Sequence, residues 1–356
     1  MTIAVVYGTR PEAIKLFPVV NELKKRNIST IITCTSQHTS LLDRSLIDPD
    51  WSWIHTKTNL NSFSKNVLSS FDFFHKAKYD FVIVQGDTNT AFSTALAAFN
   101  ANIPIAHVEA GLRTYDLSSP YPEEGYRQMI DRIATRLYAP SAIAYRNLKN
   151  EGIDRDRIVM TGNTGIDAAL QISESGKGTC KSNKNEFVLA TLHRRESIGE
   201  PLQNVCKALV ELSKHIHIVL PIHHNPAVAK IVAEECDDQL NIQLIEPMQY
   251  ADLIQTMKQA KFIITDSGGI QEEAPIFGVP VLVARENTER PEGLDADAAL
   301  LVGTNKDTIL NYSLMLLNDS KRYAKMAKPR TIYGDGTASK LIVDDILNVM
   351  RKTTQP

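Results

Sequence analysis

The sequence has few cysteines and no long apolar run, and both shortages narrow what the protein can be. Its four cysteines are scattered through 356 residues and form no Cys-x-x-Cys pair, which argues against a disulfide framework and a zinc site. No stretch is apolar for long enough to span a bilayer, and the apolar run at the amino terminus is too short for a signal peptide. We therefore expect a cytoplasmic protein with reduced cysteines and no membrane partner.

An excess of basic residues is also missing. The formal net charge is -2, so nucleic acid is not an expected partner. Hydrophobic residues make up 43% of the chain and charged residues 22%, which is ordinary for a soluble globular protein. Because the chain is too long for one small core, we expect two domains.

Short apolar runs alternate with helix-length amphipathic segments along the chain. In the first half, residues 3–7, 81–84 and 105–108 have the composition of buried strands, and residues 12–26 place apolar side chains at helical spacing. Apolar strands joined through helices form a parallel sheet covered on both faces. Right-handed crossovers then make a doubly wound domain.

The alternation weakens at residues 173–186, where glycine, serine, asparagine and lysine dominate. We interpret this segment as the linker between domains or a surface loop close to it. Further strands are expected at residues 187–192, 217–220, 242–245, 262–265 and 281–283. The predicted fold is α/β, with two doubly wound Rossmann-like domains facing each other across a cleft, and with ligands beyond the carboxyl ends of the strands.

Two strand ends carry residues suited to an anionic ligand. Gly8 follows the first strand and permits a tight turn, and Arg10 and Lys15 add positive charge beside a helix N-terminus. A plain turn with solvated side chains explains these residues equally well. At the second strand end, the segment DSGG at 266–269 lets the backbone approach a diphosphate, and Glu273 can accept ribose hydroxyls. The alternative is a capped helix with an acidic first turn, which does not explain two glycines.

Three carboxylates of the first domain are candidates for proton transfer. Asp87 and Glu109 follow predicted strands, and Glu123 precedes a helix. Asp87 could instead cap the helix that starts near Thr90. Glu123 could instead belong to a helical ladder, since Arg127 follows it at i+4. Any one of them has a structural explanation, but three directed into one cleft would not.

Histidines and arginines follow strands of the second domain. His193 and Arg194 come after one strand and His223 after the next, while Arg290 lies in a later loop. No His or Cys spacing of a metal site is present, so we expect phosphate contact or proton transfer and no metal.

Together these segments resemble one family, the non-hydrolysing UDP-N-acetylglucosamine 2-epimerases. They occur in family order over most of the chain. The matching segments are GTRPEA at 8–13, GDT at 86–88, HVEAGLRT at 107–114, PEE at 122–124, HRRE at 193–196, DSGGIQEEAP at 266–275 and TERPE at 288–292.

The resemblance implies a glycosyltransferase-B type fold, no cofactor, a homodimer and a role in cell-surface polysaccharide biosynthesis. It implies a first domain at residues 1–167, a second at 168–338 that binds UDP, and a final helix within 339–356 that packs on the first. It assigns catalysis to Asp87, Glu109, Glu123 and His193. The expected substrate-binding residues are Arg10, Lys15, Arg127, Arg194, His223, Ser267, Gly268, Gly269, Glu273 and Arg290.

The implied reaction explains the need for such residues. The C2–H of a sugar becomes acidic once UDP departs and an oxocarbenium ion develops at C1, so cations must stabilise the diphosphate. One carboxylate then removes the C2 proton, giving 2-acetamidoglucal, and a group on the opposite face returns a proton. Which carboxylate is the base is open at this stage.

Four other activities fit the same pattern. They are a glycosyltransferase of the same architecture, a hydrolysing epimerase, a C2 epimerase of a modified UDP-sugar (a diacetamido uronic acid or a 6-deoxy sugar), and a sugar-nucleotide sensor without turnover. Intact carboxylates disfavour the sensor.

The chain departs from the family near a second nucleotide site. Many bacterial members have a Gln-His pair followed by another glutamine, and later an Arg-Gln pair, with which they bind an activating UDP-N-acetylglucosamine. Here Thr39 and Ser40 follow His38, residues 55–64 contain neither arginine nor glutamine, and Tyr126 replaces the usual asparagine. We expect weak or absent activation, because neither hydroxyl replaces the charge of arginine.

Overall fold

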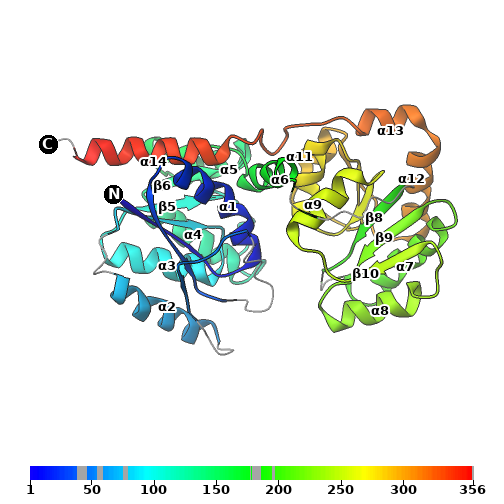
Figure 1. The fold of residues 1–356 in the computed structure, drawn as a ribbon, viewed down its shortest axis with the longest axis horizontal. Helices are drawn as coiled ribbons and strands as arrows, with labels where there is room; N and C mark the ends of the chain where they lie inside the picture. The colour runs from blue at the N-terminus through cyan, green and yellow to red at the C-terminus, as the bar shows by residue number, and fades with distance from the viewer. Residues whose placement is uncertain are drawn as a thin grey trace. The chain divides into compact units, whose positions relative to one another are not determined.

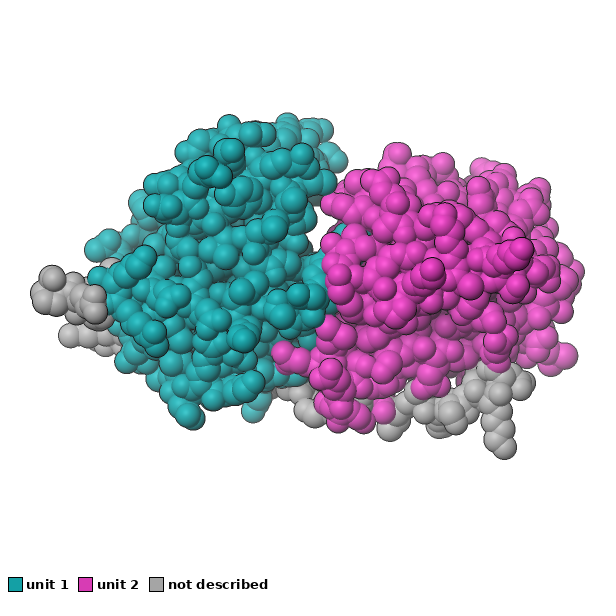
Figure 2. Space-filling view, turned by 90° about the horizontal axis from the view of Figure 1, so that it is seen from above, with its two compact units in different colours: residues 1–168, 333–356 teal, residues 169–332 magenta. Residues whose placement is uncertain are grey.

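The computed structural model describes residues 1–37, 46–53, 59–74, 79–176, 178, 186–194 and 197–354. The chain divides into two compact units (Figure 2). Unit 1 comprises Met1–Ala168 and Tyr333–Pro356, and unit 2 comprises Ala169–Ile332. The boundary lies inside helix α6 (Thr164–Glu174). The segment predicted as a linker begins at the end of α6, and its residues 177 and 179–185 lie outside the described part of the chain.

Unit 1 is built on a parallel sheet of seven strands in the order β3-β2-β1-β4-β5-β6-β7. Its central strands β1, β4 and β5 are almost wholly buried, as their continuous apolar sequences predict. The strands are β1 (Thr2–Tyr7), β2 (Ser29–Cys34), β3 (Trp51–Ser52), β4 (Phe81–Gln85), β5 (Ile105–Val108), β6 (Arg136–Ala139) and β7 (Ile158–Met160).

The helices of unit 1 connect these strands. They are α1 (Arg10–Lys25), α2 (Leu60–Phe74), α3 (Asn89–Asn100), α4 (Glu123–Ile133), α5 (Ala142–Asn150) and the short η2 (Arg155–Arg157). Helix α1 begins with a capping box between Thr9 and Glu12 and has Lys24 and Lys25 in its last turn, where they complement the helix dipole.

Unit 2 repeats the design with six parallel strands in the order β10-β9-β8-β11-β12-β13. The strands are β8 (Phe187–Thr191), β9 (His217–Pro221), β10 (Ile242–Ile245), β11 (Ile263–Thr265), β12 (Val281–Val283) and β13 (Ala299–Leu301). The helices are α7 (Glu200–Leu212), α8 (Pro226–Cys236), α9 (Tyr250–Gln259), α10 (Gly268–Glu273), η4 (Ala274–Phe277), α11 (Pro291–Asp295), α12 (Lys306–Asn318) and α13 (Ser320–Met326).

Both sheets reverse their order beside the first strand, β1 in unit 1 and β8 in unit 2. This reversal is the switch point at which doubly wound sheets bind ligands, beyond the carboxyl ends of their strands. The prediction of two doubly wound α/β sheets is therefore confirmed.

The last helix, α14 (Ala338–Thr354), belongs to unit 1 and packs on α1 (Figure 1). Asp345 accepts hydrogen bonds from Arg136 and from the hydroxyl of Tyr138, and Asp344 pairs with Arg26 at 2.5 Å. At the start of the helix, Asp167 accepts a 2.7 Å hydrogen bond from the backbone N–H of Ser339. These contacts join the end of the chain to β6, α1 and α6.

No helix in the described part of the chain is both long and apolar enough to cross a membrane.

Candidate active site

The first strand-end turn of unit 1 is stabilised by a buried carboxylate. Glu12 is 1% exposed, and its side chain accepts hydrogen bonds from the backbone N–H groups of Gly8 at 3.0 Å and Thr9 at 2.8 Å. Its second oxygen accepts a hydrogen bond of 2.6 Å from the hydroxyl of Thr88, which follows β4. Burial raises the pKa of Glu12 to about 7, against the lowering by these donors. The backbone N–H groups of Gly8 and Thr9, which precede the helix, therefore donate to Glu12.

Gly8 is required by packing rather than by its turn. A Cβ atom there would collide with the hydroxyls of Thr35 and Thr90, which bond each other at 2.7 Å. Such a close approach of neighbouring elements is one of the uses of glycine.

Glu109 stands at the end of β5 in a conformation that non-glycine residues rarely adopt. Its φ is 69°, and the side chain is 11% exposed. Lys15 from α1 donates a 2.5 Å hydrogen bond to one oxygen, and Gln85 from β4 donates to the other. A left-handed residue beside a turn costs free energy, so its presence points to a functional position.

Asp87 lies at the end of β4 and pairs with Arg127 of α4 at 2.5 Å. Burial raises the pKa of Asp87, Arg127 opposes that shift, and the negative charge of Glu109 adds to it. The alternative reading of Asp87 as a helix cap is wrong, because Thr88 caps α3 by accepting from the backbone N–H of Ala91.

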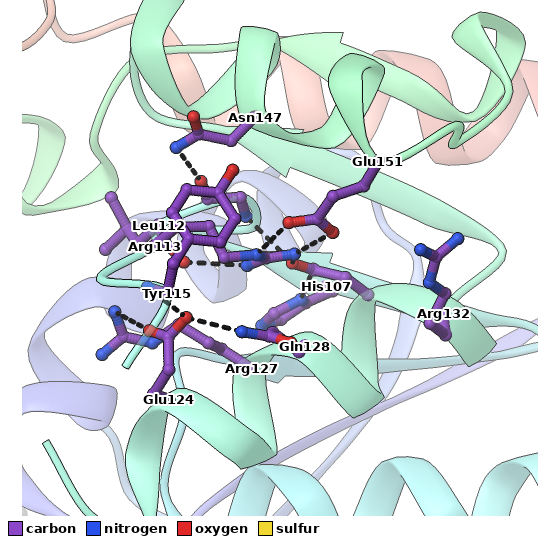
Figure 3. Close-up of polar contacts among 12 residues, drawn as sticks. His107, Leu112, Arg113, Tyr115, Glu124, Arg127, Gln128, Arg132, Asn147 and Glu151 are labelled. Carbon is purple, nitrogen blue, oxygen red and sulfur yellow. Dashed lines mark hydrogen bonds and ion pairs between the residues drawn. The ribbon is translucent and has the colours of Figure 1, made fainter. Parts of the chain in front are cut away.

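Glu123 is the first residue of α4 and is partly exposed. The helical ladder offered as its alternative is wrong, because Arg127 pairs with Asp87 and, at 3.4 Å, with Glu124. Glu124 is fully buried and accepts from the backbone N–H groups of Thr114 and Tyr115 (Figure 3). The structure brings Asp87 and Glu109 into electrostatic contact and places Glu123 at the start of the helix that carries Arg127.

In unit 2, His193 follows β8 and is oriented by a buried aspartate. Asp266 is 1% exposed and lies 2.7 Å from Nδ1 of His193. It also accepts from the backbone N–H groups of His193 and Arg194. Burial raises the pKa of Asp266, but His193 and these backbone donors lower it more, to below its usual value. An ionised Asp266 requires N–H at Nδ1, so neutral His193 has its lone pair at Nε2. Arg195 and Glu196 of the same motif lie outside the described residues.

His223 follows β9, and its ring centre lies 5.7 Å from that of His193. Its Nδ1 accepts a 3.2 Å hydrogen bond from the backbone N–H of Asn225. Burial and the nearby His193 and His224 lower the pKa of His223, so it stays neutral to lower pH than a free imidazole.

The turn after β11 carries Ser267 at the N-cap of α10, and the serine side chain makes no capping hydrogen bond. The first turn of this helix holds no acidic residue, so the capped acidic helix offered as an alternative is wrong. Gly268 lets the guanidinium of Arg290 approach closely, since a Cβ there would lie 2.8 Å from Cζ of Arg290. Arg290 in turn donates a hydrogen bond of 2.6 Å to Glu272. Glu273 accepts a hydrogen bond of 2.9 Å from the hydroxyl of Tyr250.

Comparison with known proteins identifies the family to which the chain belongs. The family model described as UDP-N-acetylglucosamine 2-epimerase matches residues 21–347. A relative of that name from Bacillus subtilis is 41% identical, with 98% of this chain and 95% of the relative aligned. A second from Neisseria meningitidis is 40% identical, over 98% of this chain and 99% of its own length. The chain belongs to the UDP-N-acetylglucosamine 2-epimerase family.

Solved structures of family members have the same fold. The crystal structure of the Neisseria meningitidis enzyme bound to UDP-GlcNAc aligns with a TM-score of 0.89 at 39% identity, over 98% of this chain and 100% of that one. The Methanocaldococcus jannaschii enzyme in complex with UDP-GlcNAc and UDP aligns at 0.81 and 34% identity, with 98% and 100% covered. The predicted glycosyltransferase-B type of fold is thus confirmed.

Two residues that organise this family site were not selected from the sequence. Glu12 had a visible signal, since Thr9-x-x-Glu12 before an apolar helix is a capping-box pattern. Asp266 was quoted only as part of a motif, and its contact with His193 joins residues 73 positions apart. No sequence spacing announces such a pair.

In the described part of the chain, no group of three or more His, Cys, Asp or Glu side chains is arranged to hold a metal ion.

Proposed function

We propose that the protein interconverts UDP-N-acetylglucosamine and UDP-N-acetylmannosamine without hydrolysing them. The observation that carries the proposal is the pair of strand-end carboxylates in unit 1, each with its own cation: Asp87 with Arg127 and Glu109 with Lys15. Two such groups match a reaction that removes a proton from one face of a carbon and returns one to the other face.

The reaction runs in two balanced steps. In the first, the C1–O bond to UDP breaks with its electron pair on the diphosphate, and a carboxylate takes the C2 proton as the C1–C2 double bond forms. In the second, a proton adds to the opposite face of C2, and the diphosphate oxygen re-forms its bond to C1. The net change is inversion at C2, so no oxidant, reductant or water is consumed.

The environment of the carboxylates suits this exchange. Asp87 has a raised pKa, which makes it a better proton acceptor than an exposed aspartate when ionised and a proton donor nearer neutral pH. Glu109 is held by Lys15 and Gln85, so its orientation is set before substrate arrives. Glu123 is the third candidate for either role, and the proposal leaves the assignment of base and acid among the three open.

The nucleotide is assigned to unit 2. We propose that Glu273 accepts the ribose hydroxyls, because Tyr250 orients its carboxylate. Ser267, Gly268 and Gly269 would face the diphosphate, with Arg290 fixed beside Gly268. His193, Arg194 and His223 would contact the same phosphates or the departing oxygen, and His193 is best suited because Asp266 sets its tautomer. In unit 1, we propose Arg10 and Lys15 as further substrate-binding residues, because both are cations near the start of α1.

The direct test gives the protein UDP-N-acetylglucosamine alone and follows the anomeric and C2 protons by NMR. We expect UDP-N-acetylmannosamine to accumulate to an equilibrium mixture, with the rate unchanged by EDTA or by added nicotinamide. Free N-acetylmannosamine with UDP would indicate hydrolysis instead. No reaction without an acceptor sugar would favour a glycosyltransferase. In a parallel assay with the UDP derivatives of a diacetamido uronic acid and a 6-deoxy sugar, conversion of only one of these would identify it as the substrate in place of UDP-N-acetylglucosamine.

A further inference from the structure

A buried polar network lies behind the two strand-end turns and has no part in the proposed chemistry. His107 is in β5 and Asp131 in α4, and both side chains are wholly inaccessible to solvent. Arg113 is equally buried and reaches Asp131 at 2.7 Å and Glu151 at 2.6 Å (Figure 3). Burying three ionisable groups is costly unless each is paired, so the arrangement needs a reason beyond packing.

His107 joins this network to the turn that carries Asp87. Its Nε2 lies 2.8 Å from the carbonyl oxygen of Gly86, which can only accept, so Nε2 carries a proton. The backbone N–H of Gly86 donates to the carbonyl oxygen of Val108 at 3.0 Å, so residues of β5 hold both backbone polar groups of Gly86. Gly86 has a φ of 70°, and Asp87 follows it directly. The orientation of Asp87 therefore depends on His107.

Asp131 joins the same network to the turn that carries Glu109. One of its oxygens lies 2.6 Å from Nδ1 of His107, and the other accepts from the backbone N–H of Gly111 at 3.2 Å. Gly111 has a φ of 87° and comes two residues after the left-handed Glu109. The buried Asp131 carboxylate is thus linked to both turns: directly to the turn after β5, and through His107 to the turn after β4.

We propose that Asp131 and His107 are positioning residues that fix Asp87 and Glu109 relative to each other. The inference rests on the proposed function, because it takes these two carboxylates as the groups that exchange the C2 proton. Neither positioning residue touches the substrate. Asp131 sets the turn after β5 directly and the turn after β4 through His107, so a change in the pair moves a catalytic carboxylate without removing it.

Two substitutions of His107 separate its contacts. The amide nitrogen of His107→Gln takes the place of Nε2 and keeps the hydrogen bond to Gly86, whereas that of His107→Asn takes the place of Nδ1 and keeps only the contact with Asp131. We expect His107→Asn to lower kcat by about 100-fold, the loss typical of a displaced catalytic group, with KM little changed. His107→Gln should lower kcat by less than about 10-fold, since it loses only the contact with Asp131. Equal losses of kcat in the two variants would overturn the proposal.

A substitution of Asp131 tests the residue that contacts both His107 and Gly111. In Asp131→Asn the amide can donate to Nδ1 of a neutral His107, which still donates from Nε2 to Gly86, and the amide oxygen still accepts from Gly111. Arg113 keeps its ion pair with Glu151 and can still donate to the amide oxygen of the new asparagine. We expect kcat within about 10-fold of the parent, in contrast to His107→Asn. A loss as deep as that of Asp87→Asn would contradict a positional role.

The matched control is Glu151→Gln, which changes the outer end of the network, where Glu151 is 18% exposed. It should lower the melting temperature somewhat and leave kcat unchanged. A fall in kcat that follows the fall in stability across all four variants would show that the network is only structural. Asp87→Asn, measured beside them, separates the two proposals: if it keeps full activity the proposed chemistry fails, and if it is inactive while both His107 variants behave alike, only the positioning role fails.

Discussion

Each carboxylate at a strand end of unit 1 has a cation from a different helix. Lys15 of α1 pairs with Glu109, and Arg127 of α4 pairs with Asp87. Two nearby carboxylates repel each other, and the charge of Glu109 contributes to the raised pKa of Asp87. The cations reduce this repulsion, so one group can hold a proton while the other does not.

Removing the charge of one carboxylate at a time tests its role. We expect Asp87→Asn, Glu109→Gln and Glu123→Gln each to lower kcat by about 100-fold or more, the size of a general acid or base contribution, with the fold intact. Steady-state kinetics and circular dichroism measure the two properties. Glu22→Gln is the control, because it only breaks a helical pair with Arg26. Near-normal epimerisation by all three variants would contradict the assignment.

The pH profile reports the pairing of Asp87 with Arg127. Arg127 lowers the pKa of Asp87 against the effect of burial, so Arg127→Gln should raise that pKa further. The limb of the kcat/KM profile that belongs to Asp87 then moves to higher pH, whether Asp87 acts as base or as acid. Arg132→Gln, on an exposed position of the same helix, should leave the profile in place. A shift to lower pH in Arg127→Gln would refute the pairing.

Sequence reasoning selected the strand-end carboxylates of unit 1 and also Lys15 and Arg127, which pair with them, but not the buried Asp131. Asp87 and Glu109 could be selected because buried apolar runs end just before them. Asp131 could not be selected, since its contacts with His107 and Gly111 span 24 and 20 positions and depend on the docking of α4. Asp266 could not be selected as the partner of His193 for the same reason.

At the scale of elements, strands with continuous apolar sequences were predicted well. β5, β10 and β12 have the predicted bounds, and β1 begins one residue before residue 3. The prediction did not include β2, whose first half is polar and partly exposed, or β13, which has only three residues. β13 is an edge strand, and β2 pairs on one side with only the two-residue β3, so both lack the continuous apolar signal of the central strands.

The start of α1 makes a prediction about stability. Glu12→Gln keeps an oxygen for the N–H groups of Gly8 and Thr9 and places its amide beside the hydroxyl of Thr88, which can turn to accept. We expect it to fold with nearly the parent's stability near pH 5, whereas Glu12→Ala should cost about 2 kcal/mol or more, because it leaves buried donors without an acceptor. Urea unfolding measures both.

The parent protein and Glu12→Gln should also differ in how their stability depends on pH. The pKa of Glu12 is about 7 in the folded state, above the value of 4.5 for an unperturbed glutamate. Its stabilising contribution is therefore complete below pH 4.5 and is lost as the pH rises through 7. Relative to Glu12→Gln, the parent should lose about 3 kcal/mol of unfolding free energy between pH 4 and pH 8. Parallel stability curves for the two proteins would show that the Glu12 pKa is not raised.

At the scale of the whole molecule, the fold class followed from the sequence because both sheets are parallel and buried. The return of α14 to unit 1 was implied only by family resemblance. Its anchors, Asp344 and Asp345, contact Arg26 and Arg136, which lie more than 200 positions earlier in the chain. Local sequence patterns carry no information about such distant contacts.

Activation by a second substrate molecule is a property of the whole enzyme that this sequence predicts to be weak. His38, Thr39 and Ser40 lie outside the described residues, while the side-chain oxygen of Gln37 accepts from the backbone N–H and hydroxyl of Thr90. Tyr126 stacks on Phe92, with ring centres 4.7 Å apart, where the family usually has asparagine. We expect pure UDP-N-acetylmannosamine to be converted at once and linearly. A long lag that a trace of UDP-N-acetylglucosamine abolishes would refute this prediction.

The fate of the C2 proton tests proton transfer at C2 most directly. The reaction of UDP-N-acetylglucosamine in deuterated water should place deuterium at C2 of UDP-N-acetylmannosamine. This exchange is expected because the carboxylate that removes the proton shares it with solvent and another group returns a proton from the opposite face. Proton NMR and mass spectrometry of the isolated product measure the label. Product formed at the full rate with no deuterium at C2 would contradict the account.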